Sequence, residues 1–225
     1  MIRKGVILAA LAVTPAVFAH DPITTKLEWT REISRLVNKH CVSCHREGGA
    51  AMSLATYEEA RPWAKAIRDE VTARRMPPWG AVKGVGDFRD DPSLSQIEID
   101  MFVNWVEGGA PKGDEIYLPP APHFNANAKP PRPNREITVA AGAPLTLTAP
   151  ADLYGVRPAR LDPGQSLEVT AYRQDGTVER LIWIRNWRPE WQRTYYFRDP
   201  VRLPKGSRIA VYSSGPAAAA VAAAP

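Results

Sequence analysis

Soft metal ligands are scarce in this sequence and are confined to its first part. The 225 residues include two cysteines, four histidines and four methionines, and none of these residue types occurs after His123. A structural zinc site normally needs four Cys or His ligands, and no second cysteine pair is present to complete one. A copper site that depends on imidazole or sulfur is likewise excluded after His123, unless a partner protein supplies the ligands.

A strong excess of charge is also absent. Lys and Arg number 29 against 24 Asp and Glu, and the net charge of +5 indicates no nucleic-acid partner. The apolar run at residues 5–19 follows Arg3 and Lys4 and is too short to span a bilayer well. We interpret residues 1–19 as a signal peptide, and Pro15 disfavours the alternative of a retained anchor. The expected protein is periplasmic or secreted, without a transmembrane anchor after cleavage.

The remaining sequence divides into two unlike parts. Residues 20–115 carry apolar residues at helical spacing, and Ser95 followed by Glu98 forms a capping-box pattern. Residues 116–135 are rich in Pro and Asn and are predicted to form a stiff linker. Residues 136–213 alternate like strands, with a hairpin signal at Asp175-Gly176. The Ala-rich residues 214–225 have too little side chain to build a core, so we predict a disordered tail.

Both cysteines lie in "CVSCH", residues 41–45. Two cysteines three residues apart can reach the two vinyl groups of one haem, and the next histidine is then carried beneath the iron. C-x-x-C-H is the attachment pattern of haem c. A disulfide is the default alternative in an exported protein, whereas a thioredoxin-type dithiol would follow a strand rather than a helix. We predict one covalent haem c at Cys41 and Cys44, with His45 as an iron ligand.

The sixth iron ligand must come from a short set of side chains, which is His20, His40, Met52, Met76, Met101 and His123. Met76 lies in "RRMPPWG", where Pro77 and Pro78 cannot continue a helix and impose an extended segment that can hold the thioether still. We predict Met76 as this ligand. The alternative is a core methionine at the end of a helix.

Two tryptophans are predicted to bind the cofactor. Trp63 and Trp79 are interpreted as packing groups of the haem pocket, and either indole N–H can donate to a propionate. Arg74 and Arg75 can pair with propionates, although an exposed basic helix end explains them equally well.

The stretch "CVSCHREGGAAMSLATYEEARPWAKAIRDEVTARRMPPWG", followed by "FRDDPSLSQIEIDMFVNWVEGGAPKGD", resembles the bacterial cytochrome c module that is fused to redoxin-like or copper type II, ascorbate-dependent monooxygenase-like domains. The resemblance covers residues 30–115 densely. It implies an all-α cytochrome c-like domain with covalent haem, and it places Met76 at the family's axial position.

The second half resembles the β-sandwich of those monooxygenase-like proteins in "YRQDG", "WQRTY" and "LPKGSR". The resemblance implies an all-β, jelly-roll-like sandwich after the cytochrome domain. Such a domain would bind copper through a His-x-His pair and a methionine, but the corresponding segment here reads "ADLYGVRPARLDPGQ". We therefore expect no bound copper and no monooxygenase activity, and we assign no catalytic residue.

These patterns favour an exported electron carrier whose β domain docks a periplasmic redox partner. A basic aromatic face is expected to provide the docking surface, unless the tryptophans fill the core; its residues are Trp183, Arg185, Trp187, Arg188, Trp191 and Arg193. The alternatives are a haem-based sensor or peroxidase with an open sixth position, and an accessory subunit of a copper monooxygenase system. A binding module in which the β domain is the working part is a third hypothesis.

Overall fold

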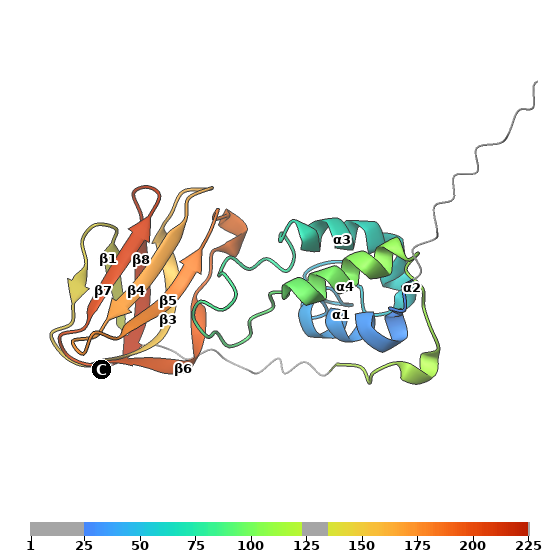
Figure 1. The fold of residues 1–225 in the computed structure, drawn as a ribbon, viewed down its shortest axis with the longest axis horizontal. Coiled ribbons are helices and arrows are strands. Elements are labelled where there is room, and N and C mark those ends of the chain that lie inside the picture. Colours follow the sequence, from blue (N-terminus) through green and yellow to red (C-terminus); the bar gives the residue numbers. More distant parts are fainter. Residues whose placement is uncertain (1–24, 123–134, 225) are drawn as a thin grey trace, which may run out of the picture.

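Two hydrophobic cores form in the computed structural model, which describes residues 25–122 and 135–224. One core lies among helices and the other between two β-sheets (Figure 1). This arrangement confirms the predicted fold class of an all-α domain followed by an all-β sandwich. The interpreted signal peptide and most of the predicted linker lie outside the described residues. Within the described ranges, no helix is both long and apolar enough to cross a membrane.

The helical region contains four α-helices and three short turns of other helix types among the described residues. Their bounds are η1 Trp29–Ile33, α1 Ser34–His40, α2 Tyr57–Ala60, η2 Arg61–Trp63, α3 Ala64–Thr72, α4 Gln96–Glu107 and η3 Glu115–Tyr117. The predicted capping box of Ser95 and Glu98 starts α4, and Gly108 follows its last residue. Trp105 of α4 is fully buried and donates its indole N–H to the Pro111 carbonyl at 3.0 Å.

The β region contains eight strands within the described residues. They are β1 Arg135–Ala140, β2 Leu145–Thr146, β3 Ala151–Arg160, β4 Leu167–Tyr172, β5 Val178–Ile184, β6 Tyr195–Leu203, β7 Arg208–Ser213 and β8 Ala218–Ala224. One sheet has the order β1-β8-β3-β6 and the other β2-β7-β4-β5, with antiparallel pairing throughout. This order is that of a jelly roll. The Asp175-Gly176 turn joins β4 to β5, as predicted, with Gly176 at φ +87°.

The prediction of a disordered tail is wrong, because residues 218–224 form strand β8 between β1 and β3. Residues 219–223 are each at most 4% exposed. On one face, Glu136 of β1 pairs in register with Ala222, and Arg157 of β3 pairs with Ala220. The Arg157 guanidinium binds the Glu136 carboxylate at 2.8 Å and 2.9 Å, so this ion pair bridges over the alanines. Small side chains are what this covered strand requires.

The connection between α3 and α4 crosses to the β region (Figure 1). Ala81 and Phe88 belong to the β core, and the Val82 N–H donates to the Trp183 carbonyl at 2.7 Å. Isolated bridges also pair Ala81 with Ile184 and Phe88 with Phe197. The predicted domain limit at residue 115 therefore does not separate the two cores, since residues 79–89 pack with the β domain.

The described start of the predicted linker packs on the helices. The Arg31 guanidinium lies 3.6 Å from the centre of the Tyr117 ring, and Arg35 donates to the Tyr117 carbonyl at 3.1 Å. Residues 115–118 therefore belong to the helical region.

The expected aromatic docking face is wrong for two of its tryptophans. Trp187 and Trp191 are each 7% exposed and belong to the β core, so for them the core-filling alternative is confirmed. Trp183 is half-buried, and the guanidinium groups of Arg180 and Arg185 lie 5.3 Å and 5.2 Å from its ring centre.

Candidate haem site

The C-x-x-C-H motif forms a tight turn at the end of α1. The Cys41 N–H donates to Val37 at 2.8 Å, and the N–H groups of Cys44 and His45 both donate to the Cys41 carbonyl, at 3.0 Å and 2.9 Å. Cys41 and Cys44 are free thiols, so the structure does not contain the alternative disulfide. Burial, and then the charge of Cys44, raise the pKa of Cys41 to about 12. The two thiols are thus presented by one short turn.

The loop after the motif returns against it. The Ala51 N–H donates to the Cys44 carbonyl at 3.2 Å, and the Leu54 N–H donates to the His45 carbonyl at 3.1 Å. Gly49 permits this close return, because a Cβ there would lie 2.4 Å from the Cys44 carbonyl oxygen.

This loop also orients His45. Its Nδ1 lies 3.0 Å from the Met52 carbonyl oxygen. A carbonyl can only accept, so Nδ1 carries the hydrogen and the neutral ring keeps its lone pair at Nε2. A backbone acceptor on one ring nitrogen is the usual support of a histidine that ligates a metal through the other. The chain therefore presents Nε2 of His45 in the form that iron requires.

The structure disfavours two candidates for the sixth ligand, His40 and Met101. His40 is 3% exposed, with Nδ1 2.8 Å from the Pro92 carbonyl and Nε2 3.0 Å from Glu98, so neither nitrogen is free. Met101 is partly buried and packs against the helical core. His20 and His123 lie outside the described residues.

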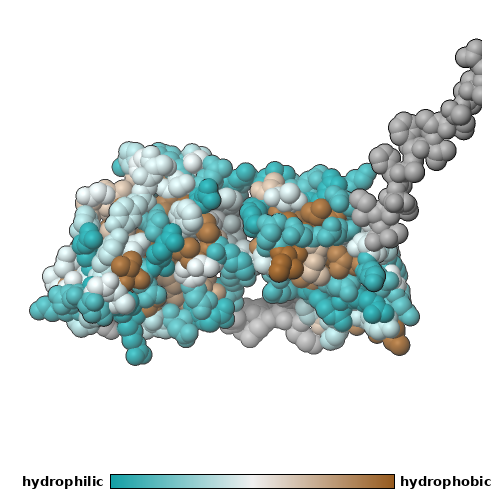
Figure 2. All heavy atoms as spheres, viewed as in Figure 1, coloured by the Kyte–Doolittle hydropathy of each residue, from teal (hydrophilic) through white to brown (hydrophobic). Residues whose placement is uncertain are grey.

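Large apolar side chains are exposed near the motif and on either side of α3. Met52 is 48% exposed, Trp63 46% and Met76 42%. Figure 2 shows apolar surface on the helical region where it faces the β region. A planar apolar cofactor would cover such surface, and two free thiols with an oriented imidazole are the groups that haem c needs. The residues present therefore fit the cofactor, although a role for Trp63 stays a prediction.

The segment around Met76 is held by neighbours on both sides. Arg75 forms two 2.8 Å contacts with the Glu70 carboxylate, and Arg74 donates to Gln96 at 2.8 Å. Hydrogen bonding to Arg75 lowers the pKa of Glu70. Both arginines are thus engaged within the protein.

Trp79 lies among aromatic rings of the β core rather than in the helical core. Its ring centre is 4.7 Å from that of Tyr195 and 5.9 Å from that of Phe88. The sequence interpretation of Trp79 as haem packing missed this placement. The only signal was the double proline before it, which turns the chain away from α3.

A residue that sequence analysis missed fixes this segment to the β domain. The Tyr195 hydroxyl accepts from the Gly80 N–H at 3.3 Å and donates to the Trp191 carbonyl at 3.0 Å. Burial raises the pKa of Tyr195 to about 12. A Cβ on Gly80 would lie 2.7 Å from the Trp191 ring, so only glycine fits this contact. The β core thereby anchors the chain four residues after Met76.

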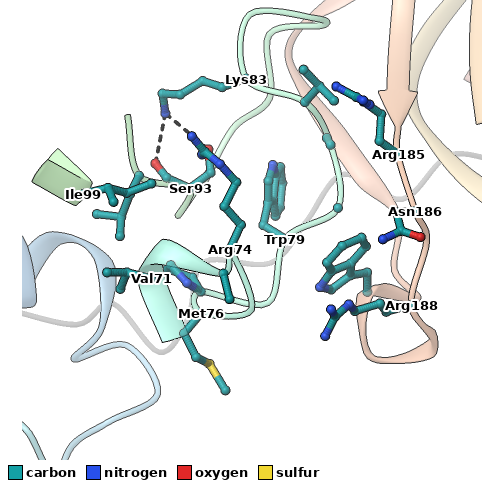
Figure 3. A pocket seen from close by; sticks show the side chains of 17 residues that line it. Val71, Arg74, Met76, Trp79, Lys83, Ser93, Ile99, Arg185, Asn186 and Arg188 are labelled. Carbon is teal, nitrogen blue, oxygen red and sulfur yellow. Dashed lines mark hydrogen bonds between the residues drawn. The ribbon is translucent and has the colours of Figure 1, made fainter. Parts of the chain in front are cut away.

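A cavity of about 540 Å³ lies between this segment and the β domain. Met76, Trp79 and Arg74 line it from the helical side, and Arg185, Asn186 and Arg188 line it from the segment after β5 (Figure 3).

Residues 29–105 match the family model described as "Cytochrome C oxidase, cbb3-type, subunit III". No curated protein matches the chain. The match includes the attachment motif, Met76 and most of α4, and it leaves the β region uncovered. Together with the geometry of the motif, it supports a c-type cytochrome module within residues 29–105, a kind of domain that binds haem c covalently and transfers electrons. In the described ranges, no three His, Cys, Asp or Glu side chains cluster as a metal site of their own.

Proposed function

We propose that this protein is an exported electron carrier in which His45 and Met76 ligate the iron of one covalent haem c. The bound haem supplies a one-electron redox centre. The observation that carries the proposal is the hydrogen bond from His45 Nδ1 to the Met52 carbonyl at 3.0 Å, which leaves Nε2 available to the iron. With both axial positions filled by protein, electron transfer is favoured over chemistry on a bound molecule.

The same hydrogen bond favours Met76 over Met52. The Met52 backbone is held on the Nδ1 side of the imidazole. If His45 held the iron through Nε2, a residue fixed beside Nδ1 would be poorly placed to supply the sixth ligand. Met76 belongs to a different segment, is 42% exposed and is not packed in either core.

In this proposal the β domain has two roles. It anchors the segment after Met76 through Tyr195 and the strand-like contacts of residues 81–89. It also docks a redox partner in the periplasm, and half-buried Trp183 with Arg180 and Arg185 remains as the aromatic, basic surface for that contact.

The experiment compares Met76→Ala with Met52→Ala in haem-loaded protein. We expect Met76→Ala to lose the sulfur-to-iron charge-transfer band of the ferric form, to bind CO when reduced, and to lower the reduction potential by on the order of 100 mV. Met52 is not a ligand in this proposal, so Met52→Ala serves as the matched control.

An unchanged spectrum in Met76→Ala, or loss of the band in Met52→Ala, would refute the ligand assignment. Immediate CO binding by the unmodified protein would instead favour the sensor or peroxidase with an open sixth position.

A further inference from the structure

The cavity between the Met76 segment and the β domain is strongly cationic (Figure 3). No Asp or Glu is among the described residues that line it. Its basic lining residues come from both regions of the protein and are Arg74, Lys83, Arg185 and Arg188. Like charges held around one space repel one another, unless an anion lies between them.

The carboxylates of the protein neutralise these cations poorly. Within the described residues, Arg185 has no carboxylate partner and Arg74 binds only the neutral Gln96 amide. Arg188 is 3.9 Å from Glu190, and Lys83 is 3.5 Å from Asp91. The charge of Arg188 also helps to lower the pKa of Glu70, which does not line the cavity. Acidic groups thus lie near these cations, but none of them is a lining residue among those described.

Two indole groups supply an independent observation. Trp79 and Trp191 both line the cavity, and the Nε1 atom of each is buried without a hydrogen-bond partner in the part of the chain that the structure describes. Trp191 is 7% exposed. An indole N–H can only donate, and a buried donor without an acceptor costs free energy. The residues that line the cavity thus include no carboxylate and two unpaired indole donors.

We propose that this cavity binds a small oxyanion, either a multivalent carboxylate or a phosphate. Guanidinium groups match both through paired N–H donors, and the arginines approach from opposite sides of the cavity. The ligand supplies the negative charge that the lining lacks. The site lies where the Met76 segment meets the β domain, so the bound anion joins the two regions. This inference goes beyond electron transfer and does not depend on which residue ligates the iron.

The test is calorimetric titration of the full-length, haem-loaded protein with citrate and, separately, with inorganic phosphate. Ionic strength is held constant with sodium chloride, so that simple charge screening is the same throughout. We expect one site per chain with a Kd of about 1 mM or tighter for at least one probe. The probe that binds more tightly shows whether the site prefers a multivalent carboxylate or a phosphate.

Arg185→Gln and Arg188→Gln are each expected to weaken binding about tenfold. Arg160→Gln, an exposed residue of β3 that does not line the cavity, is the control and changes Kd by less than about twofold. Thermal unfolding of each variant checks that the fold is kept.

Absence of saturable heat with both probes would overturn the proposal. Haem propionates that already filled the cavity would give this same result, and it would count against the proposal equally. Equal affinity in Arg185→Gln, Arg188→Gln and Arg160→Gln would also overturn it. Heat of binding is read independently of the optical spectrum, so failure of the Met76 assignment and failure of this site are separate results.

Discussion

His45 and His40 show how hydrogen-bond partners distinguish two histidines in one short segment. His45 gives only Nδ1 to the protein, at 3.0 Å from a carbonyl, and keeps Nε2 free. His40 has both nitrogens engaged, at 2.8 Å and 3.0 Å from acceptors. The sequence predicts His45 as a ligand from the motif alone. It does not exclude His40, because Pro92 and Glu98 are more than 50 residues away along the chain.

Glu98 gives the clearest pH dependence. Burial opposes its ionisation, but hydrogen bonds from the Ser95 backbone, Lys39, the Ser95 hydroxyl and His40 outweigh burial and lower its pKa from 4.5 to about 2. A carboxyl whose pKa is lower in the folded state stabilises the fold above its unfolded pKa. This stabilisation is lost as the pH falls from 4.5 through about 2.

We expect Glu98→Gln to reduce the free energy of unfolding at pH 7 by about 2 kcal/mol, with the difference from wild type shrinking below pH 4.5. Denaturant unfolding at several pH values measures this, and exposed Glu47 provides a Gln control. A difference that is the same at pH 7 and pH 3 would show that the ionised carboxylate is not the source of the effect.

The segment after α3 depends on an element far along the chain. The Ser95–Glu98 capping box and the Asp175-Gly176 hairpin are predictable because they involve residues a few positions apart. The contact between Gly80 and Tyr195 joins residues 115 positions apart, and no local sequence pattern predicts it. Sequence analysis therefore finds the elements around the site but not the anchor of the Met76 segment.

Tyr195→Phe tests this anchor. Removal of the hydroxyl leaves the Gly80 N–H without its acceptor and the Trp191 carbonyl without its donor, at a cost of about 1–3 kcal/mol. We also expect the methionine band of the ferric protein to weaken. Tyr196→Phe, the neighbour on β6 with no hydroxyl bond to the described residues, is the control. A destabilised Tyr195→Phe protein with a full methionine band would show that the anchor is structural only.

Strand β8 shows why an alanine-rich composition led to a wrong prediction of disorder. Low side-chain volume predicts a poor core, yet here the core of the sandwich covers one face and the Glu136–Arg157 pair covers the other. Ala222 lies in register with Glu136 and is 4% exposed. The covering residues are over 60 positions earlier, so the tail alone gives no sign of them.

We expect Ala222→Leu to destabilise the β domain by about 1–3 kcal/mol, because the larger side chain would enter the space beneath the ion pair. Ala218→Leu, at the half-buried start of the strand, is expected to cost less. Thermal unfolding of both variants makes the comparison, and equal stability of the two would contradict the covered placement of Ala222.

Across the whole molecule, the order of an all-α region and an all-β region is predictable because each is encoded by local periodicity. The shared packing of residues 79–89 is not, since it depends on how the two regions meet. The c-type cytochrome module at residues 29–105 is accordingly linked to the β core through the segment that carries Met76. This segment is the physical connection through which the proposed partner or anion at the β domain would act on the haem side.

The most direct measurement is the optical spectrum of the haem-loaded protein, oxidised and reduced, with and without CO. We predict a ferric spectrum with the methionine charge-transfer band and a reduced spectrum that CO does not change, because the proposed ligands His45 and Met76 would leave no open position on the iron. A reduced spectrum that shifts at once on addition of CO would contradict the electron-carrier account and indicate an open iron.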